Sequence, residues 1–177
     1  MEIRQAQQKD AQRIAEIYNH FIKHTVVTFE ETHVSADEMW QRVSAVQATS
    51  YPYLVGEMPD QVIAGYAYGA QWKNRSAYRF AAEVSIYLAP EFIGQGLGAR
   101  LYRELIQSLR EQGIHSVMGG IALPNDASVA LHEKLGFQKV AHFKELGWKQ
   151  SRWIDVGYWE LDLGNREFPE HEFPQQE

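Results

Sequence analysis

The sequence predicts an α/β or α+β protein with a mixed sheet flanked by helices. Short segments of β type alternate along the chain with segments of helical periodicity, and a helical run follows the central strand directly, as in a crossover connection. The 177 residues suit one domain with a sizeable core. We expect residues 1–163 to form this domain, and residues 164–177, which are acidic and contain prolines, to form a flexible tail or an interaction arm.

The N-terminal segment predicts a strand followed by a helix. Residues 2–6 suit a short strand with Ile3 on its buried face. A helix is expected to start at Asp10, because apolar side chains between Ile14 and Ile22 then recur at helical spacing.

The next segment predicts a second helix and a hairpin. Residues 26–30 are rich in β-forming residues and lead to a turn. Ser35 begins a capping box, in which its hydroxyl accepts a hydrogen bond from the backbone N–H of Glu38 and starts the helix. Residues 53–57 and 62–68 suit two strands joined by a Pro-Asp turn, which makes them a hairpin.

The central stretch is expected to run from a strand through a glycine-rich turn into a helix. Residues 83–88 (EVSIYL) alternate with the period of two that is typical of a strand. Pro90 ends the strand because it has no N–H to donate. The turn at residues 94–98 (GQGLG) then leads into a helical run over residues 99–111.

The remaining segments predict three strands and one helix. We expect strands at residues 115–122, 137–142 and 153–163 and a helix at residues 127–135. Gly119 and Gly120 lie inside the first of these strands, and Gly136 closes the helix as a C-terminal cap.

Composition excludes several classes of site. The formal net charge of −6 disfavours a nucleic-acid or anionic-membrane surface. The absence of cysteine removes disulfides, cysteine-based metal sites and a cysteinyl intermediate. The polar start lacks the apolar core of a signal peptide, and no apolar run could span a bilayer, so we expect a cytoplasmic protein.

The glycine-rich turn predicts an anion site. Glycines let the backbone approach a ligand closely, and the first N–H groups of a helix have no partner inside the helix. The pattern Gly94-x-Gly96-x-x-Ala99 also matches the dinucleotide fingerprint. That fingerprint requires an acidic residue about 20 positions later, and residues 115–123 contain none. A phosphate cradle is therefore favoured over a dinucleotide site.

Two polar segments have both a functional and a plain structural interpretation. His20 and His24 are four residues apart on the first helix, but no further ligand lies nearby in the sequence, so a solvated face is favoured over a metal site. Residues 72–78 (WKNRSAY) form a loop rich in cations and aromatics. Such loops carry binding residues, and arginine suits oxyanions, which favours a substrate rim over an ordinary solvated loop.

Several segments together resemble one enzyme family. The runs SIYLAPEFIGQGLGARLY, LPNDAS and ALHEKLGF, with YNHFI, TVVTFE, WKNRSAY and GWKQSRWIDVGYWELDL, resemble the GNAT acetyltransferase superfamily. Within it, the likeness is strongest to phosphinothricin N-acetyltransferases and to relatives that acetylate methionine sulfoximine. It extends from about Ile3 to Leu163. The resemblance implies a mostly antiparallel central sheet flanked by helices, with two strands splayed apart to receive coenzyme A.

The resemblance implies acetyl-CoA as co-substrate, and no metal. Its pyrophosphate would meet the backbone N–H groups of Gly94, Gln95, Gly96, Leu97, Gly98 and Ala99. Its acetyl carbonyl and pantetheine arm would pair with the backbone of Ile86, Tyr87 and Leu88, and the side chain of Asn125 would help to hold the arm. Ile93 departs from the pattern, because the superfamily loop usually begins with glutamine or arginine.

The resemblance also implies two catalytic residues. An amine must be neutral to attack, and an α-amine with a pKa of roughly 8 is mostly protonated at pH 7. Glu83 lies at the family position for the base that accepts the amine proton. His132 lies where many members carry a tyrosine that protonates the leaving thiolate, and the phosphinothricin branch has a histidine there. Glu83 could instead be a solvated or paired strand residue, and His132 a packed helix residue.

The acceptor and the partner follow from the same resemblance. Lys73, Arg75, the backbone of Ser76, Ala77 and Tyr78, and Phe29 would line a pocket for a glutamate-like amino acid bearing a phosphinate, sulfoximine or sulfone. Because the family pocket lies near a dimer interface, a homodimer is expected. Two alternatives stay open: acetylation of another amine, such as a protein N-terminus or an aminoglycoside, and a CoA-binding regulatory module without turnover.

Overall fold

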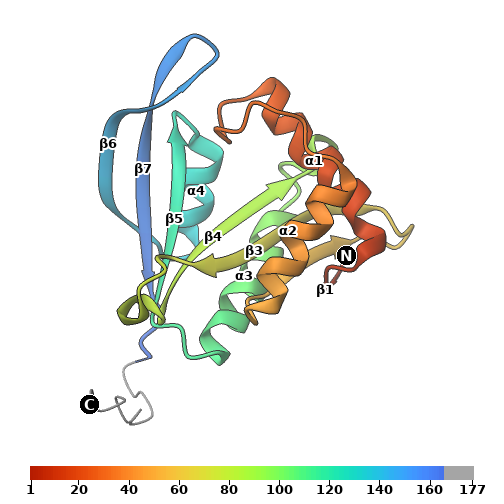
Figure 1. The fold of residues 1–177 in the computed structure, drawn as a ribbon. Helices are drawn as coiled ribbons and strands as arrows, with labels where there is room; N and C mark the ends of the chain where they lie inside the picture. Colours follow the sequence, from red (N-terminus) through yellow and green to blue (C-terminus); the bar gives the residue numbers. More distant parts are fainter. Residues whose placement is uncertain (166–177) are drawn as a thin grey trace, which may run out of the picture.

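Seven strands form one mixed sheet in the order β1-β2-β3-β4-β5-β7-β6 (Figure 1). Neighbouring strands are antiparallel except β4 and β5, which run parallel. This computed structural model describes residues 1–165, so most of the expected tail, from residue 166 onward, lies outside the described residues. The strands are β1 (Glu2–Gln5), β2 (Tyr53–Glu57), β3 (Ile63–Gln71), β4 (Ala81–Leu88), β5 (Ser116–Leu123), β6 (Gln138–Lys149) and β7 (Arg152–Asp162).

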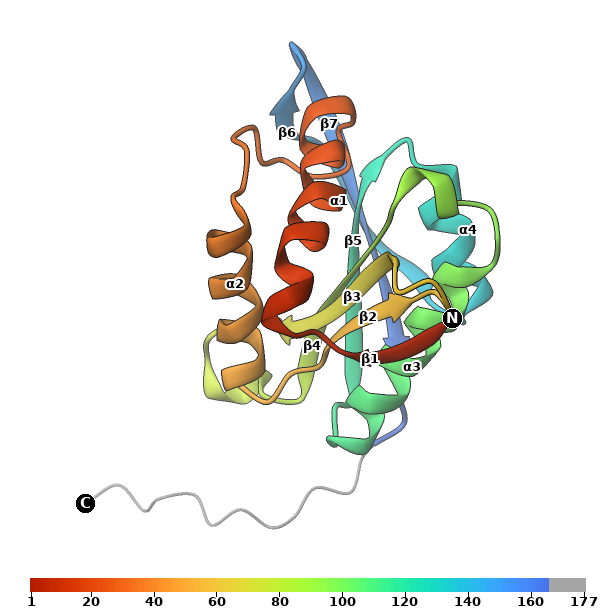
Figure 2. The same cartoon turned by 90° about the vertical axis from the view of Figure 1, so that its right-hand side faces the viewer.

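Helices cover both faces of the sheet (Figure 2). One face carries α1 (Ala11–His24) and α2 (Ala36–Ala48), and the other carries α3 (Leu97–Glu111) and α4 (Asp126–Lys134). The predicted class, a mixed and mostly antiparallel sheet flanked by helices, is confirmed. Within residues 1–165, no helix is both long enough and apolar enough to cross a lipid bilayer.

Each face of the sheet has its own apolar core. Below α1 and α2 the core is built from aliphatic residues of the helices and tyrosines of the strands, including Ile14, Ile17, Val43, Tyr53 and Tyr66. Below α3 the leucines that recur along its inner face pack on the sheet with Val84, Val117, Phe137 and Trp159. The helical spacing seen in the sequence therefore corresponds to buried faces, and these two cores hold the central strands in place.

The strands β4 and β5 separate soon after they meet. They pair only at Ala81↔Ser116, Ala82↔Val117 and Glu83↔Met118. Beyond Glu83 the two strands diverge, as Figure 1 shows, while β4 stays paired with β3 up to Leu88. The splayed strand pair implied by the resemblance is thus present, and its apex is at Glu83.

The structure differs from the expectations in two segments. Residues 26–30 form no strand; they belong to a loop anchored by side chains, in which Lys149 Nζ donates to the carbonyl of Thr28 (2.7 Å) and the Tyr18 hydroxyl donates to Glu30 (2.8 Å). Strand β6 continues to Lys149, well past the expected end at residue 142. A bulge between Phe143 and Gly147 interrupts the alternation with a period of two, so the sequence pattern does not indicate a strand there.

The helix starts follow their sequence signals more closely. The Ser35 hydroxyl accepts from the backbone N–H of Glu38 (3.1 Å), so the predicted cap of α2 is confirmed. The reciprocal bond of the capping box is replaced, because the Glu38 carboxylate pairs with Arg42 instead (2.6 Å). Helix α3 begins at Leu97, two residues earlier than expected.

Candidate active site

The glycine-rich turn forms an open mouth at the start of α3. Gly94 and Gly96 have φ values of +80° and +74°, in the left-handed region that favours glycine. A Cβ at either position would meet no heavy atom within 4 Å, so the space above the turn is free. Because the first N–H groups of a helix lack intrahelical partners, this mouth can accept an anion.

Gly98 brings the mouth close to β4. A Cβ at Gly98 would lie 3.2 Å from Leu88 Cδ1 and 3.7 Å from Ile86 Cδ1. The bare glycine therefore allows the first turn of α3 to pack directly against the end of the strand. The exposed side chain of Ile93, at the position where the family carries a polar residue, offers no hydrogen bond.

The gap between β4 and β5 holds a pocket. Ser85, Ile86 and Tyr87 line it from β4, and Gly120 to Ala122 line it from β5. After Glu83 the edge of β4 that faces β5 has no strand partner in the described part of the chain, so its main-chain groups can pair with an extended ligand. Asn125 lines the same gap and caps α4, where its Oδ1 accepts from the Ser128 N–H (3.1 Å).

Glu83 stands at the apex of the gap, in the last paired position of β4. Its side chain is half-buried, and this burial raises the pKa of its carboxyl group, while the positive charge of Lys73 opposes the rise. A carboxylate with a raised pKa is a stronger base than an ordinary one. Glu83 therefore has the environment that a proton acceptor needs.

His132 lies on α4 and is almost completely buried, with 4% of its surface exposed. Its Nδ1 is 2.8 Å from the Ser128 carbonyl, which can only accept, so Nδ1 carries the hydrogen. Its Nε2 then accepts from the Tyr102 hydroxyl at 3.0 Å. Burial lowers the pKa of His132, which keeps the ring neutral near pH 7.

Tyr102 is a polar group of the gap that sequence reasoning missed. Its spacing from Leu105 and Leu109 is that of an ordinary core residue of a helix, so nothing in the sequence pattern marks it as functional. The structure buries it completely and joins its hydroxyl to His132, and it lines the gap between β4 and β5. The sequence does contain one signal, which is a tyrosine on the apolar face of the predicted helix. A buried tyrosine hydroxyl needs a hydrogen-bond partner, so this residue should contact another polar group.

The expected acceptor residues lie in three separate places. Lys73 lies over the Trp72 ring (4.5 Å), and Trp72 packs edge-on against Tyr158 of β7 (5.3 Å), which places Lys73 on the Glu83 side of the sheet. Residues 75–78 are exposed, and Ser76–Tyr78 form a 3₁₀ turn that contains three of the expected acceptor residues.

Phe29 lies apart from both Lys73 and residues 75–78. It comes from the loop between α1 and α2, and its ring fills the space where a Cβ of Gly147 would lie. It is 41% exposed, so part of the ring faces solvent. Phe29 therefore lies against the hairpin formed by β6 and β7, which we call the β6–β7 arm, while Lys73 is held by Trp72.

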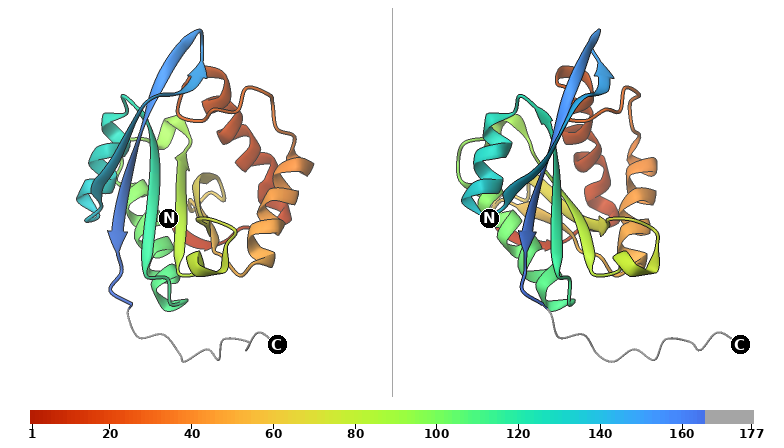
Figure 3. Two further views of the ribbon diagram at one scale, coloured as in Figure 1. Left: turned by 60° about the vertical axis from the view of Figure 1, so that its left-hand side comes forward. Right: turned by 90° about the vertical axis from the view of Figure 1, so that its left-hand side faces the viewer.

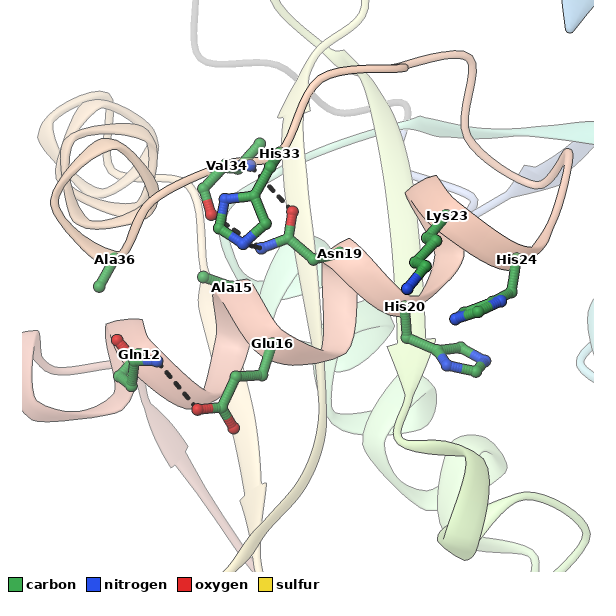
Figure 4. A pocket seen from close by; sticks show the side chains of 10 residues that line it. All are labelled: Gln12, Ala15, Glu16, Asn19, His20, Lys23, His24, His33, Val34 and Ala36. Atoms are coloured by element: carbon green, nitrogen blue, oxygen red, sulfur yellow. Dashed lines mark hydrogen bonds between the residues drawn. The ribbon is translucent and has the colours of Figure 1, made fainter.

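A separate pocket of about 380 Å³ runs along α1 and shares no lining residue with the gap (Figure 4). His20 and His24 lie at one end of it with Lys23, and His33 is bonded to Asn19 (3.1 Å). Within residues 1–165, no three His, Asp or Glu side chains gather in a way that could hold a metal ion.

Comparisons with known proteins agree with this geometry. A family model described as an acetyltransferase (GNAT) domain matches residues 3–157. The phosphinothricin N-acetyltransferase of Streptomyces viridochromogenes is 38% identical over 163 residues, which cover 92% of this chain and 88% of that protein. The L-methionine sulfoximine/L-methionine sulfone acetyltransferase of Salmonella typhimurium is 36% identical over 170 residues, covering 96% of this chain and 99% of that protein.

A solved structure gives the same result at the level of the fold. The phosphinothricin acetyltransferase of Sinorhizobium meliloti, in complex with AcCoA, superposes with a TM-score of 0.92 and 36% identity. The match covers 98% of this chain and 95% of that chain.

Proposed function

This chain belongs to the GNAT acetyltransferase family, and we propose that it moves the acetyl group of acetyl-CoA to the α-amine of a small glutamate-like amino acid analogue. Phosphinothricin, methionine sulfoximine and methionine sulfone are the acceptors that we expect. The names of the two curated relatives support this substrate class. The observation that carries the proposal is the split between β4 and β5, which has an anion-binding mouth at one end and Glu83 at its apex.

Acetyl-CoA fits the residues that line the split. The N–H groups from Gly94 to Ala99 would hold its diphosphate, since two of these residues adopt left-handed backbone with free space above. The unpaired edge of β4 at Ile86, Tyr87 and Leu88 would pair with the pantetheine arm. The Asn125 amide nitrogen stays available to the arm, because the cap of α4 uses the side-chain oxygen.

The reaction forms a C–N bond and breaks the C–S bond of the thioester. The amine must lose one proton and the departing thiolate must gain one. Glu83 takes up the amine proton, directly or through one water, and its raised pKa suits this task. On the other side of the gap, His132 and the Tyr102 hydroxyl form the polar pair beside the departing sulfur.

His132 serves the thiolate through this pair and not as an isolated acid. In the neutral ring, the Nδ1 hydrogen is bonded to Ser128 and the Nε2 lone pair is bonded to Tyr102. The Tyr102 hydroxyl can therefore stabilise the departing thiolate by a hydrogen bond when it turns from His132, and because burial raises the pKa of Tyr102 the thiolate takes its proton from water. Holding the amine and thioester together contributes an effective molarity of about 10⁵ M or more, so this proton step adds a smaller factor.

A substrate panel tests the proposal. Release of the CoA thiol is measured with phosphinothricin and methionine sulfoximine beside glutamate, methionine, a peptide with a free N-terminus and an aminoglycoside. We expect kcat/KM for the two analogues to exceed that for the other amines by about tenfold or more. A preference for the peptide or the aminoglycoside would transfer the substrate assignment to that amine class.

A second copy of the chain is the partner that we propose. The exposed apolar side chains of the hairpin formed by β6 and β7, among them Trp148 and Trp153, support this partner because a second copy could cover them. Light scattering, which measures the mass of the particle in solution, tests this partner.

A further inference from the structure

We propose that Gly119 and Gly120 of β5 are positioning residues, whose missing side chains let His132 and Glu83 approach the reacting groups from opposite faces of the sheet. The inference rests on the proposed acetyl transfer and adds two residues to it. The pair lies directly after Met118, the last residue of β5 that pairs with β4. It therefore stands where the gap opens.

Gly119 makes room for His132. A Cβ at Gly119 would lie 2.5 Å from His132 Nε2 and 2.7 Å from Cδ2, inside van der Waals contact. The imidazole cannot move away freely, because Tyr102 and Phe137 pack edge-on against it with ring centroids at 5.2 Å and 5.0 Å. Its two nitrogens are also bonded to fixed partners. A methyl group here would have to displace the ring and break the bond to Tyr102.

Gly120 makes room on the opposite face, because successive side chains of a strand alternate. A Cβ at Gly120 would lie 3.4 Å from Glu83 Oε1 and 3.2 Å from Tyr158 Cε1. Gly120 is exposed whereas Gly119 is buried, so the space beside Glu83 is open to an incoming acceptor. A methyl group here would narrow that space without destroying the packing.

The two glycines therefore predict separable effects. Gly119→Ala should disturb the side of the sheet that holds His132 and α4, and Gly120→Ala should disturb the side that holds Glu83 and the acceptor. A purely structural role for the pair would lower stability in both variants without separating the kinetic parameters. Gly56→Ala is the matched control, since Gly56 lies in β2 and its Cβ would meet only the flexible end of Met1 (2.6 Å).

Kinetics and NMR of the three variants form the first test. For Gly119→Ala we expect kcat to fall about tenfold to a hundredfold with little change in acceptor KM, because the ring is misplaced. The ¹⁵N resonance of His132 Nε2 should shift as its bond to Tyr102 is lost. For Gly120→Ala we expect an acceptor KM raised about tenfold, with the His132 resonance unchanged. Equal changes in both variants, or an unshifted His132 resonance in Gly119→Ala, would overturn the inference.

A double-mutant cycle covers the case in which Gly119→Ala fails to fold. His132→Ala removes the ring that the new methyl group would strike. We expect Gly119→Ala to reduce the free energy of unfolding in the wild-type background and to cost little in the His132→Ala background. The same loss in both backgrounds, or a failure of the double variant to fold where His132→Ala alone folds, would contradict the proposed contact.

Failure of this inference can be told apart from failure of the proposed function. The NMR shift and the unfolding cycle require no acetyl transfer, so they report on Gly119 even when no amine is acetylated. A wild-type protein that releases no thiol with any acceptor would refute the function, and the unfolding cycle would still decide whether Gly119 makes room for His132.

Discussion

Burial drives two side chains of the gap towards their neutral forms. It raises the pKa of Glu83 and lowers the pKa of His132, because desolvation disfavours a charge of either sign. Lys73 opposes this effect at Glu83 and helps to keep a usable fraction of the carboxylate ionised. The amine side of the reaction thus has a strengthened base, and the thiolate side has a neutral hydrogen-bonded pair.

Replacing the base is the first prediction at this scale. Glu83→Gln should slow turnover by about 10²–10⁴ at neutral pH, because the amide cannot accept the amine proton. Activity should recover in part as the pH rises, since a larger fraction of the amine is then already neutral. The measurement is kcat/KM against pH for both proteins. An unchanged profile in the variant would remove Glu83 from the base role.

The buried histidine predicts a pH dependence of stability. The pKa of His132 is lowered in the folded state, so the unfolded chain binds a proton here at pH values where the folded chain does not. Its contribution to the free energy of unfolding is therefore complete above the unfolded pKa of about 6.5 and is lost as the pH falls towards the folded pKa. Urea unfolding at several pH values should show this loss in the wild type and a weaker one in His132→Gln. The same dependence of the free energy of unfolding on pH in both proteins would contradict the contribution of His132.

A functional residue can be proposed from the sequence when it belongs to a recognisable motif and its side chain has an obvious chemical role. Glu83 and His132 could be proposed from their motifs, and the structure brings both to the gap, although their roles stay predictions. The partner of Tyr102 could not be predicted, because it is thirty residues away along the chain and becomes a neighbour only when α3 packs beside α4. The tautomer of His132, in contrast, follows from a contact within α4, where Nδ1 is bonded to the Ser128 carbonyl.

At the scale of elements, the start of α3 carries the coenzyme site that we propose. Gly96→Val should abolish measurable acetyl-CoA binding in calorimetry, because a branched side chain would project into the free space above the turn and strain the left-handed backbone. Gly113→Val is the matched control: Gly113 follows α3, has a φ of +80° and equally free space, so its strain is similar. Equal affinities in the two variants would refute the cradle.

The prediction of elements succeeded where contacts between nearby residues decide the structure. It failed where contacts between residues far apart in the sequence decide it. The cap at Ser35 is local, since its bond spans three residues, and it is confirmed. Residues 26–30 have strand-forming composition but lie in a loop, because Lys149, far along the chain, bonds their backbone. The second half of β6 follows a bulge whose register is set by β7, so residues 143–149 have no regular alternation to detect.

At the scale of the whole molecule, the β6–β7 arm extends beyond the rest of the sheet (Figure 3). Its tip exposes large apolar side chains, which are Phe143 at 46%, Leu146 at 57%, Trp148 at 53% and Trp153 at 57%. Such a cluster is typical of an interaction surface. The fold class could be predicted from the order of elements, but an exposed surface of this kind depends on which side chains the packing leaves uncovered.

The proposed homodimer places this arm against a second copy. Light scattering should give a mass about twice the 20.4 kDa of one chain. A Trp148→Ser/Trp153→Ser variant should shift the mass towards the monomer, whereas Val62→Ser, which changes an exposed apolar residue beside β3, should not. A monomeric wild type would contradict the dimer, and a dimeric double variant would contradict the arm as its interface.

A crystal structure of the complex with acetyl-CoA tests most directly how the gap works. We expect diphosphate oxygens within about 3 Å of backbone nitrogens between Gly94 and Ala99. The thioester should lie between β4 and β5, with Glu83 on one side and the Tyr102–His132 pair on the other. A diphosphate bound elsewhere, with the mouth of α3 filled by the protein's own side chains, would contradict the account.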